Sequence, residues 1–200
     1  MSKTYWEAVK GRRSIRLIGD EVIVPEERVE EIVRDALTHV PSAFNCQGTR
    51  LVLLFGGAHK KLWSLTLDAL KNVTPAEQFE NTKKKINTSF ASGYGTILFY
   101  EDQSVVERLM SSFPIYAKNF PVWSEHTNGM HQFAIWTALS AEGLGVSLQH
   151  YNPLIDEAIA KEWTLPASWK LIAQMPFGAP LTVPDNKQYL PLEDRLKVVR

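Results

Sequence analysis

The chain has 200 residues, 44% of them apolar, which is enough to bury the core of one domain spanning residues 1–200. Lysine and arginine number 22, as do aspartate and glutamate, so the net charge is zero, and we expect no nucleic-acid binding through a general surplus of positive charge. The single cysteine, Cys46, excludes an intrachain disulfide. We expect a cytoplasmic protein that does not cross a membrane, because the N-terminus lacks an apolar signal segment and the longest apolar run is only Leu51–Phe55.

Helical patterns dominate the sequence. A short amphipathic helix containing Trp6 and Val9 comes first, and Pro25 then precedes apolar residues that recur every three or four positions from Val29 to Leu37. The longest candidate, Trp123–Glu142, is apolar on more than one face, so we expect it to lie in the middle of the molecule. Further helices are expected at His59–Asn72, at Pro75–Phe90 and from about Leu154.

Strand candidates are short and rich in β-branched or aromatic residues. Because they alternate with helices instead of forming hairpins, they predict a mixed sheet covered by helices, in an α+β or three-layer sandwich fold. The candidates are Arg50–Phe55, Gly95–Tyr100, Val146–Leu148 and Leu171–Phe177.

Several common motifs are missing. Neither Gly93-Tyr94-Gly95 nor Gly143-Leu144-Gly145 has the third glycine of a dinucleotide fingerprint, and no phosphate-binding loop of the Gly-Lys-Ser/Thr type occurs. The histidines lack the spacing of metal ligands, since His126 and His131 would lie on different faces of a helix. These absences disfavour a metal site and a tightly bound dinucleotide.

The first positive signal is the run Gly11-Arg12-Arg13-Ser14-Ile15-Arg16, which follows the first predicted helix. Three guanidinium groups and a hydroxyl this close together can surround a phosphate. The alternative is that the arginines face solvent and complement the dipole of the preceding helix. The glycine and the compact order of the run favour a specific anion site.

Two polar loops follow. Pro41-Ser42-Ala43-Phe44-Asn45-Cys46-Gln47 offers uncharged donors and acceptors that suit the edge of a heterocycle, although such residues also populate ordinary loops. Leu148-Gln149-His150-Tyr151-Asn152-Pro153 comes directly after a predicted strand, a common position for ligand contacts or for a simple turn. The charged segment Pro191–Lys197 near the C-terminus is typical of a solvated tail when taken alone.

Taken in this order, the four segments resemble the FMN-dependent nitroreductase family over about residues 5–198. The phrases Gly95-Thr96-Ile97-Leu98-Phe99, Leu148–Pro153 and Pro191–Arg195 are similar to the short subgroup described as fatty-acid-repression-mutant-type nitroreductases. The resemblance implies a three-layer sandwich with a mixed, mostly antiparallel sheet, assembled as a domain-swapped type of homodimer with two FMN sites at its interface.

The resemblance also assigns residues to the cofactor. The arginine run would hold the FMN phosphate and ribityl chain, the second segment would reach the flavin of the other subunit, and the third would line the isoalloxazine. Two basic residues near the C-terminus would return to the phosphate. In that order the residues are Arg12, Arg13, Ser14 and Arg16; Pro41, Ser42, Asn45 and Gln47; Leu148, Gln149, His150 and Tyr151; and Arg195 and Lys197.

Some departures from the family leave contacts open. Ala43 stands where many relatives have a second serine. Pro153 has no N–H, so the source of the hydrogen bond to flavin N5 is open here. A contact to the pyrimidine ring could come from Lys84, Lys85 or Asn87.

The expected activity is reduction of nitroaromatic or related oxidants by NAD(P)H in two hydride-transfer half-reactions. Both substrates would stack in turn on the same flavin face, so we expect no essential catalytic acid or base from the protein. The alternative is a non-enzymatic flavin- or lipid-binding regulator linked to fatty-acid or stress responses, because the name of the subgroup refers to lipid regulation.

Overall fold

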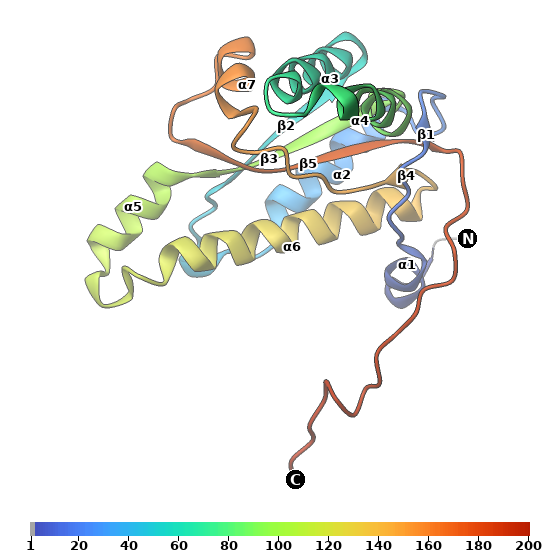
Figure 1. Cartoon of the computed structure of the whole chain (residues 1–200). Coiled ribbons are helices and arrows are strands. Elements are labelled where there is room, and N and C mark those ends of the chain that lie inside the picture. The colour runs from blue at the N-terminus through green and yellow to red at the C-terminus, as the bar shows by residue number, and fades with distance from the viewer. Residues whose placement is uncertain (1–2) are drawn as a thin grey trace.

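The computed structural model describes residues 3–200, which form one α+β body followed by an extended C-terminal tail (Figure 1). Two short 3₁₀ turns, η1 and η2, accompany the regular elements. In chain order the elements are α1 (Tyr5–Gly11), β1 (Ile18–Gly19), α2 (Glu26–His39), η1 (Ala43–Asn45), β2 (Thr49–Phe55), α3 (Gly56–Lys71), α4 (Ala76–Ser89), β3 (Gly95–Asp102), α5 (Gln103–Ser112), η2 (Pro114–Tyr116), α6 (Phe120–Ala141), β4 (Gly145–Val146), α7 (Asp156–Glu162) and β5 (Trp169–Pro180).

The sheet has the strand order β1-β5-β3-β2, with β4 paired to β5. Each pairing between these strands is antiparallel, and a parallel contact occurs at the isolated bridge between Ser14 and Val146. Among residues 3–200, strand β2 pairs only with β3, so it forms one edge of the sheet.

Helices cover both faces of this sheet, with α2 and α6 on one side and α3, α4 and α7 on the other (Figure 1). Successive side chains of β3 therefore enter two different cores, because neighbouring residues of a strand point to opposite faces. Ile97 and Phe99 pack with α2 and α6, whereas Leu98 and Tyr100 pack with α3, α4 and α7. The predicted three-layer α+β architecture is confirmed.

The long helix differs most from its prediction. It begins at Phe120 instead of Trp123, and only one of its faces is buried against the sheet. The outward side exposes Val122, Met130 and Phe133, which are each between 42% and 52% accessible. Within one chain, α6 is thus an outer-layer helix with an uncovered apolar face, not the centre of the molecule.

Strand β1 and helix α5 were absent from the sequence-based prediction, and strand β4 is shorter than predicted. β1 has two residues and exists through its pairing with β5, while α5 follows β3 directly, with Asp102 capping its first turn through the Ser104 N–H. Strand β4 ends at Val146, and the chain rejoins β5 only at an isolated bridge between Gln149 and Gln174.

The C-terminal tail, residues 181–200, has no helix or strand and runs away from the body of the protein (Figure 1). Its start is held by a hydrogen bond from Leu181 N to Leu17 O. Further along, the apolar side chains of Val183, Tyr189, Leu190 and Val199 are all at least 70% exposed. Among the described residues, none of the helices has the length and apolar character that a membrane span requires.

Candidate functional site

Arg12 is the best-placed residue of the arginine run. It caps the C-terminus of α1, and its guanidinium carbon lies 4.4 Å from the ring centroid of Trp136 on α6. Burial lowers the pKa of Arg12, and the neighbouring charge of Arg13 lowers it further. Within residues 3–200 the Arg12 side chain has no hydrogen-bond or ion-pair partner, so its N–H groups are available to a ligand.

A cavity of about 320 Å³ lies directly beside this stack. Polar groups come from Arg12, Ser14 and Gln132, and one wall is open because Gly129 carries no side chain and has free space next to it. The cavity therefore combines a cation and a hydroxyl with apolar and aromatic surface. Its lining is Arg12, Ser14, Gly129, Gln132, Phe133, Trp136 and Leu148.

The other two arginines of the run are placed differently. Arg13 donates from Nη2 to the backbone oxygen of Asp185 at 2.6 Å, so in this chain it holds the start of the tail. Arg16 is exposed to solvent. The structure thus brings Arg12 and Ser14 together at one cavity, while the phosphate contacts of Arg13 and Arg16 stay predictions.

The loop from Pro41 to Gln47 has an unusual backbone. Phe44, Asn45 and Gln47 all have φ between 50° and 57°, a left-handed conformation that non-glycine residues rarely adopt. The Ser42 hydroxyl stabilises the turn by accepting a hydrogen bond from Gln47 N at 3.0 Å. Such strain persists only where the surroundings enforce it, and it is concentrated at functional sites.

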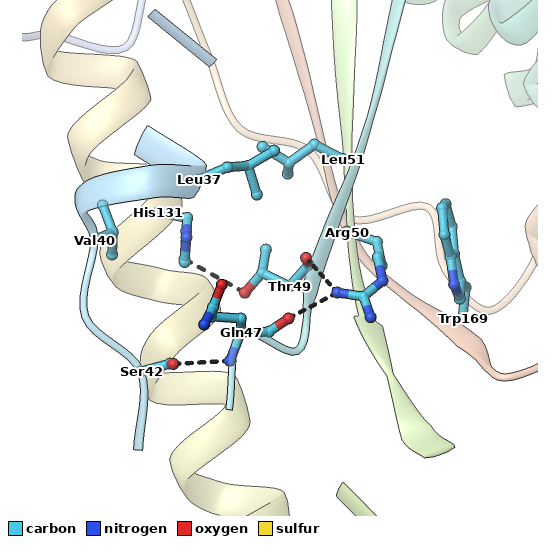
Figure 2. Close-up of a pocket in the computed structure, with 9 residues that line it drawn as sticks. All are labelled: Leu37, Val40, Ser42, Gln47, Thr49, Arg50, Leu51, His131 and Trp169. Atoms are coloured by element: carbon cyan, nitrogen blue, oxygen red, sulfur yellow. Dashed lines mark hydrogen bonds between the residues drawn. The ribbon is translucent and has the colours of Figure 1, made fainter. Parts of the chain in front are cut away.

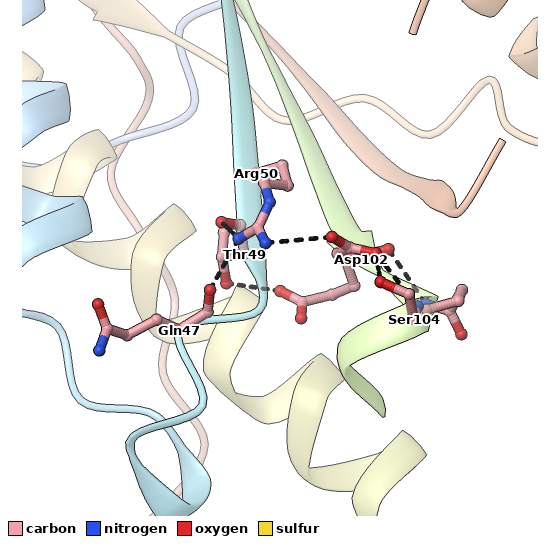
Figure 3. Close-up of polar contacts among 7 residues, drawn as sticks. Gln47, Thr49, Arg50, Asp102 and Ser104 are labelled. Atoms are coloured by element: carbon pink, nitrogen blue, oxygen red, sulfur yellow. Dashed lines mark hydrogen bonds and ion pairs between the residues drawn. The ribbon is translucent and has the colours of Figure 1, made fainter. Parts of the chain in front are cut away.

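An ion pair that was not predicted from the sequence fixes the end of this loop (Figure 3). Arg50 donates to the Gln47 and Thr49 carbonyl oxygens at 2.7 and 3.1 Å, and to Asp102 Oδ2 at 3.1 Å. Burial alone would raise the pKa of Asp102, but hydrogen bonds from Ser104 and the charge of Arg50 outweigh it and lower that pKa. The pairing follows from the register of β2 on β3, which the sequence does not reveal.

A second cavity, of about 310 Å³, lies between the loop, the end of α2 and β2 (Figure 2). A buried polar network adjoins its lining residue Thr49: Thr49 Oγ1 donates to Glu101 Oε1 at 2.6 Å, and Asn128 Nδ2 donates to the same oxygen at 2.9 Å. Burial raises the pKa of Glu101 despite these bonds, and burial lowers the pKa of His131, whose Nδ1 lies 3.0 Å from Thr127 O. Both pKa shifts favour the neutral forms.

Aromatic rings gather beside the loop. Phe44 is 51% exposed and contacts four rings of the α5–η2–α6 connection, including a stacked arrangement on Trp123 with centroids 6.3 Å apart. The rings in contact with it are Phe113, Tyr116, Phe120 and Trp123. This cluster attaches the loop to the beginning of α6.

The arginine cavity and the loop lie at different ends and on different flanks of α6. Arg12 stacks on Trp136, whereas Phe44 stacks on Trp123, 13 positions earlier. At ~1.5 Å and ~100° per residue, these two contacts are about 20 Å apart along the helix and point about 140° away from each other. Within one chain the body of α6 therefore separates the two predicted halves of the site.

The segment after β4 is divided between surface and core. Leu148 lines the arginine cavity, Gln149 pairs with Gln174 through its backbone, and His150 is exposed. The Tyr151 ring packs edge-to-face against Trp63, on the opposite side of the sheet from α6, and burial raises its pKa. In this chain Tyr151 is thus largely a packing residue, and its flavin contact stays a prediction.

The remaining predicted residues lie on the surface. Arg195 and Lys197 are exposed on the tail, which runs away from the body of the protein (Figure 1), so their contact with the phosphate stays a prediction. Lys84, Lys85 and Asn87 are all exposed on α4, which does not distinguish among them.

The sequence matches the nitroreductase family over residues 9–179. Two proteins of Saccharomyces cerevisiae named as nitroreductases are similar: HBN1 is 35% identical over 94% of this chain and 93% of its own length, and FRM2 is 33% identical over 93% of both.

Solved structures agree with these matches. The nitroreductase CinD of Lactococcus lactis, determined in complex with chloramphenicol, is 42% identical, with a TM-score of 0.90 over 98% of this chain and 100% of that one. A nitroreductase of Desulfitobacterium hafniense with bound FMN is 15% identical and shares the fold over the full length of both chains, with a TM-score of 0.71.

Proposed function

The chain belongs to the nitroreductase family, and from that membership and the geometry of the arginine cavity we propose that it is an FMN-dependent oxidoreductase. We propose further that it uses NAD(P)H to reduce nitroaromatic or related electron-accepting compounds. The similarity to FRM2 confirms the resemblance to the fatty-acid-repression-mutant subgroup. CinD, whose structures include complexes with 4-nitrophenol and chloramphenicol, supports small aromatic substrates.

The residues of the arginine cavity fit FMN. The Arg12 guanidinium has no carboxylate partner in the described part of the chain, so its charge is free to attract a phosphate, and the Ser14 hydroxyl supplies a further donor. Leu148 and Phe133 supply the apolar surface that a flavin ring needs, and Gly129 leaves room beside them. This uncompensated cation beside apolar walls is the single observation that carries the proposal.

The protein contributes binding and orientation. Bound FMN supplies the redox chemistry, since it can accept a hydride from a reduced nicotinamide and transfer electrons to an oxidant. We propose that the protein supplies no essential acid or base for this chemistry. We expect the two substrates to occupy the same surface in turn, which gives ping-pong kinetics.

A complete site needs two copies of the chain. The loop 41–47 cannot reach the arginine cavity of its own chain because α6 lies between them, but a second copy packed on the exposed apolar face of α6 can bring its own loop there. A homodimer of this kind also covers Val122, Met130 and Phe133. We expect an interface of about 2,000 Å² or more, as in obligate dimers.

The C-terminal tail of the second copy fits the free edge of the sheet. Alongside β2 run two adjoining cavities of about 310 and 300 Å³ that share Leu37, and together we call them the β2 groove. An extended segment laid in it can bond to the unpaired backbone groups of β2 and bury the exposed apolar side chains of the tail. This exchange of tails is the domain-swapped type of homodimer predicted from the sequence. It would bring Arg195 and Lys197 of one copy to the FMN phosphate held by the other copy.

The activity is tested by purifying the protein and identifying its cofactor. We expect a yellow protein that releases FMN, not FAD, and that oxidises NADH or NADPH when 4-nitrophenol or chloramphenicol is added. Double-reciprocal plots at several oxidant concentrations are expected to be parallel. A protein that FMN cannot reconstitute would overturn the proposal.

The assembly is tested by changing one tail residue. Leu190→Asp places a charge on a tail side chain that is 70% exposed in the single chain, and we expect it to shift sedimentation from dimer towards monomer and to weaken FMN retention. Val73→Asp, at a similarly exposed position after α3, is the matched control and should leave both unchanged. A Leu190→Asp protein that remains a fully FMN-loaded dimer would contradict the exchange of tails.

A further inference from the structure

Arginine side chains in the described part of the chain are held in contrasting ways. Arg28 bonds to Glu142 and Glu31, and Arg50 bonds to Asp102, so each of these cations is compensated by a carboxylate. Arg12 is held by the indole ring of Trp136 instead. An aromatic anchor attracts the cation through its ring quadrupole but brings no negative charge.

This difference matters for an anion site. A carboxylate beside Arg12 would neutralise its charge and compete for the same N–H groups that a phosphate needs. A guanidinium that lies flat on an indole directs no N–H towards the ring, so the donors along its edge stay free for a ligand. A long, flexible arginine is thereby restrained before the ligand arrives, which reduces the entropy lost on binding.

The indole N–H does not explain why tryptophan stands at this position. Trp136 Nε1 is buried and has no acceptor in the described part of the chain, so the residue makes no hydrogen bond there. Its ring, in contrast, carries the Arg12 guanidinium, and Trp136 lines the cavity together with Arg12 and Ser14. The part of Trp136 that acts on the site is therefore the face of the ring.

We propose that Trp136 is a positioning residue for the cofactor phosphate: its indole face holds the Arg12 guanidinium flat, with the donor edge turned to the cavity. The inference rests on the proposed FMN site and adds a residue to it. Trp136 itself does not contact the phosphate, and its effect passes through Arg12.

The test compares FMN with riboflavin, which lacks the phosphate. We expect Trp136→Leu to raise the dissociation constant of FMN by roughly five- to thirty-fold, the range of a partly desolvated cation–π contact, and to leave that of riboflavin unchanged. Trp136→Phe keeps a weaker aromatic face and should give an intermediate value. Fluorescence titration of the apoprotein measures all of these constants without an activity assay.

A double-mutant cycle with Arg12→Ala tests whether Trp136 affects FMN binding through Arg12. Once Arg12 is absent, Trp136→Leu should cause no further loss of FMN affinity, because there is no guanidinium left to position. Trp163→Leu is the matched control, since Trp163 is also half-buried but packs in the core on the other side of the sheet. It should leave both dissociation constants unchanged.

The outcomes separate the inference from the function on which it rests. If wild-type protein binds FMN no more tightly than riboflavin, the proposed phosphate site is wrong. If wild type prefers FMN but Trp136→Leu weakens both ligands equally, or weakens FMN equally with and without Arg12, then Trp136 has only a packing role. If thermal melting shows that Trp136→Leu does not fold, the affinities of Trp136→Phe for FMN and riboflavin distinguish a positioning role from a packing role.

Discussion

Acid should destabilise this fold through one buried histidine. His59 on α3 is 1% exposed, its Nδ1 lies 2.9 Å from Thr96 Oγ1, and its Nε2 lies 3.3 Å from Ala91 O. Burial lowers the pKa of His59 from 6.5 to about 4, because a charged imidazolium is poorly solvated in this core. The neutral ring satisfies both contacts by accepting from Thr96 and donating to Ala91.

The size and sign of the effect follow from the difference between the pKa of His59 in the folded and in the unfolded chain. Between pH 6.5 and 4 the unfolded chain binds a proton at His59 that the folded chain does not, so stability falls as the pH falls. At ~1.36 kcal/mol for each pH unit, His59 alone removes about 3 kcal/mol from the free energy of unfolding across this window. That is a large part of the 5–15 kcal/mol typical of a domain.

Urea unfolding of wild type and His59→Gln between pH 4 and 7.5 measures this contribution. Glutamine can bond to Thr96 but does not titrate, so the variant should lose less stability on acidification. The difference in the free energy of unfolding between wild type and variant should therefore change by about 3 kcal/mol between pH 6.5 and 4. Parallel curves would refute the reasoning, since they would mean that His59 titrates alike in the folded and unfolded chain.

Three further predictions concern the site. Arg12→Ala or Arg16→Ala should weaken FMN binding by about 1.5–3 kcal/mol, the scale of a charge-assisted hydrogen bond, with partial rescue by excess FMN; unchanged affinity in equilibrium dialysis would mean that the arginines face solvent only. Arg50→Met and Asp102→Asn should each lower the free energy of unfolding by about 1–3 kcal/mol but combine with less than additive loss, and strict additivity in urea titrations would show that the ion pair is not coupled. His150→Ala should slow the oxidative half-reaction by far less than the ~10²–10⁴-fold of a lost general acid or base, so a thousand-fold drop in stopped-flow measurements with FMN fully bound would identify His150 as a catalytic residue.

The parts of the fold that were predictable are those with a strong local pattern. Strand β3 was located from its β-branched and aromatic residues, and helix α6 from its length and apolar content, with ends displaced by at most three residues. β1 could not be found this way, because its two residues are a strand only through pairing with β5. The same is true of the outward face of α6, whose apolar side chains look like core until the layers are known.

The same distinction between local pattern and packing applies to the candidate site. Arg12 and Ser14 were recognisable because they stand two positions apart in the sequence and line the same cavity. The contact of Arg12 with Trp136 depends on how α1 packs on α6, and the Arg50–Asp102 pair depends on strand register. The left-handed backbone at Phe44 carries no sequence signal, since no glycine marks it. Local chemistry was thus predictable, whereas contacts made by packing were not.

The central claim, that each FMN site combines the arginine cavity of one copy with the loop of another, is tested by mixing two defective chains. One chain carries Arg12→Ala, and the other carries Asn45→Gly and Gln47→Gly, which remove loop side chains while allowing the observed positive φ. Each variant homodimer should bind FMN weakly. A mixed dimer, isolated through two different tags, contains one site with both defects and one with neither.

We therefore predict that the mixed dimer binds one FMN per dimer with wild-type affinity, whereas a dimer carrying all three substitutions in the same chain, paired with itself, binds none tightly. Equilibrium titration of the tagged mixed dimer gives the answer directly. A mixed dimer without any site of wild-type affinity, or a monomer that retains FMN, would contradict a site shared between two copies.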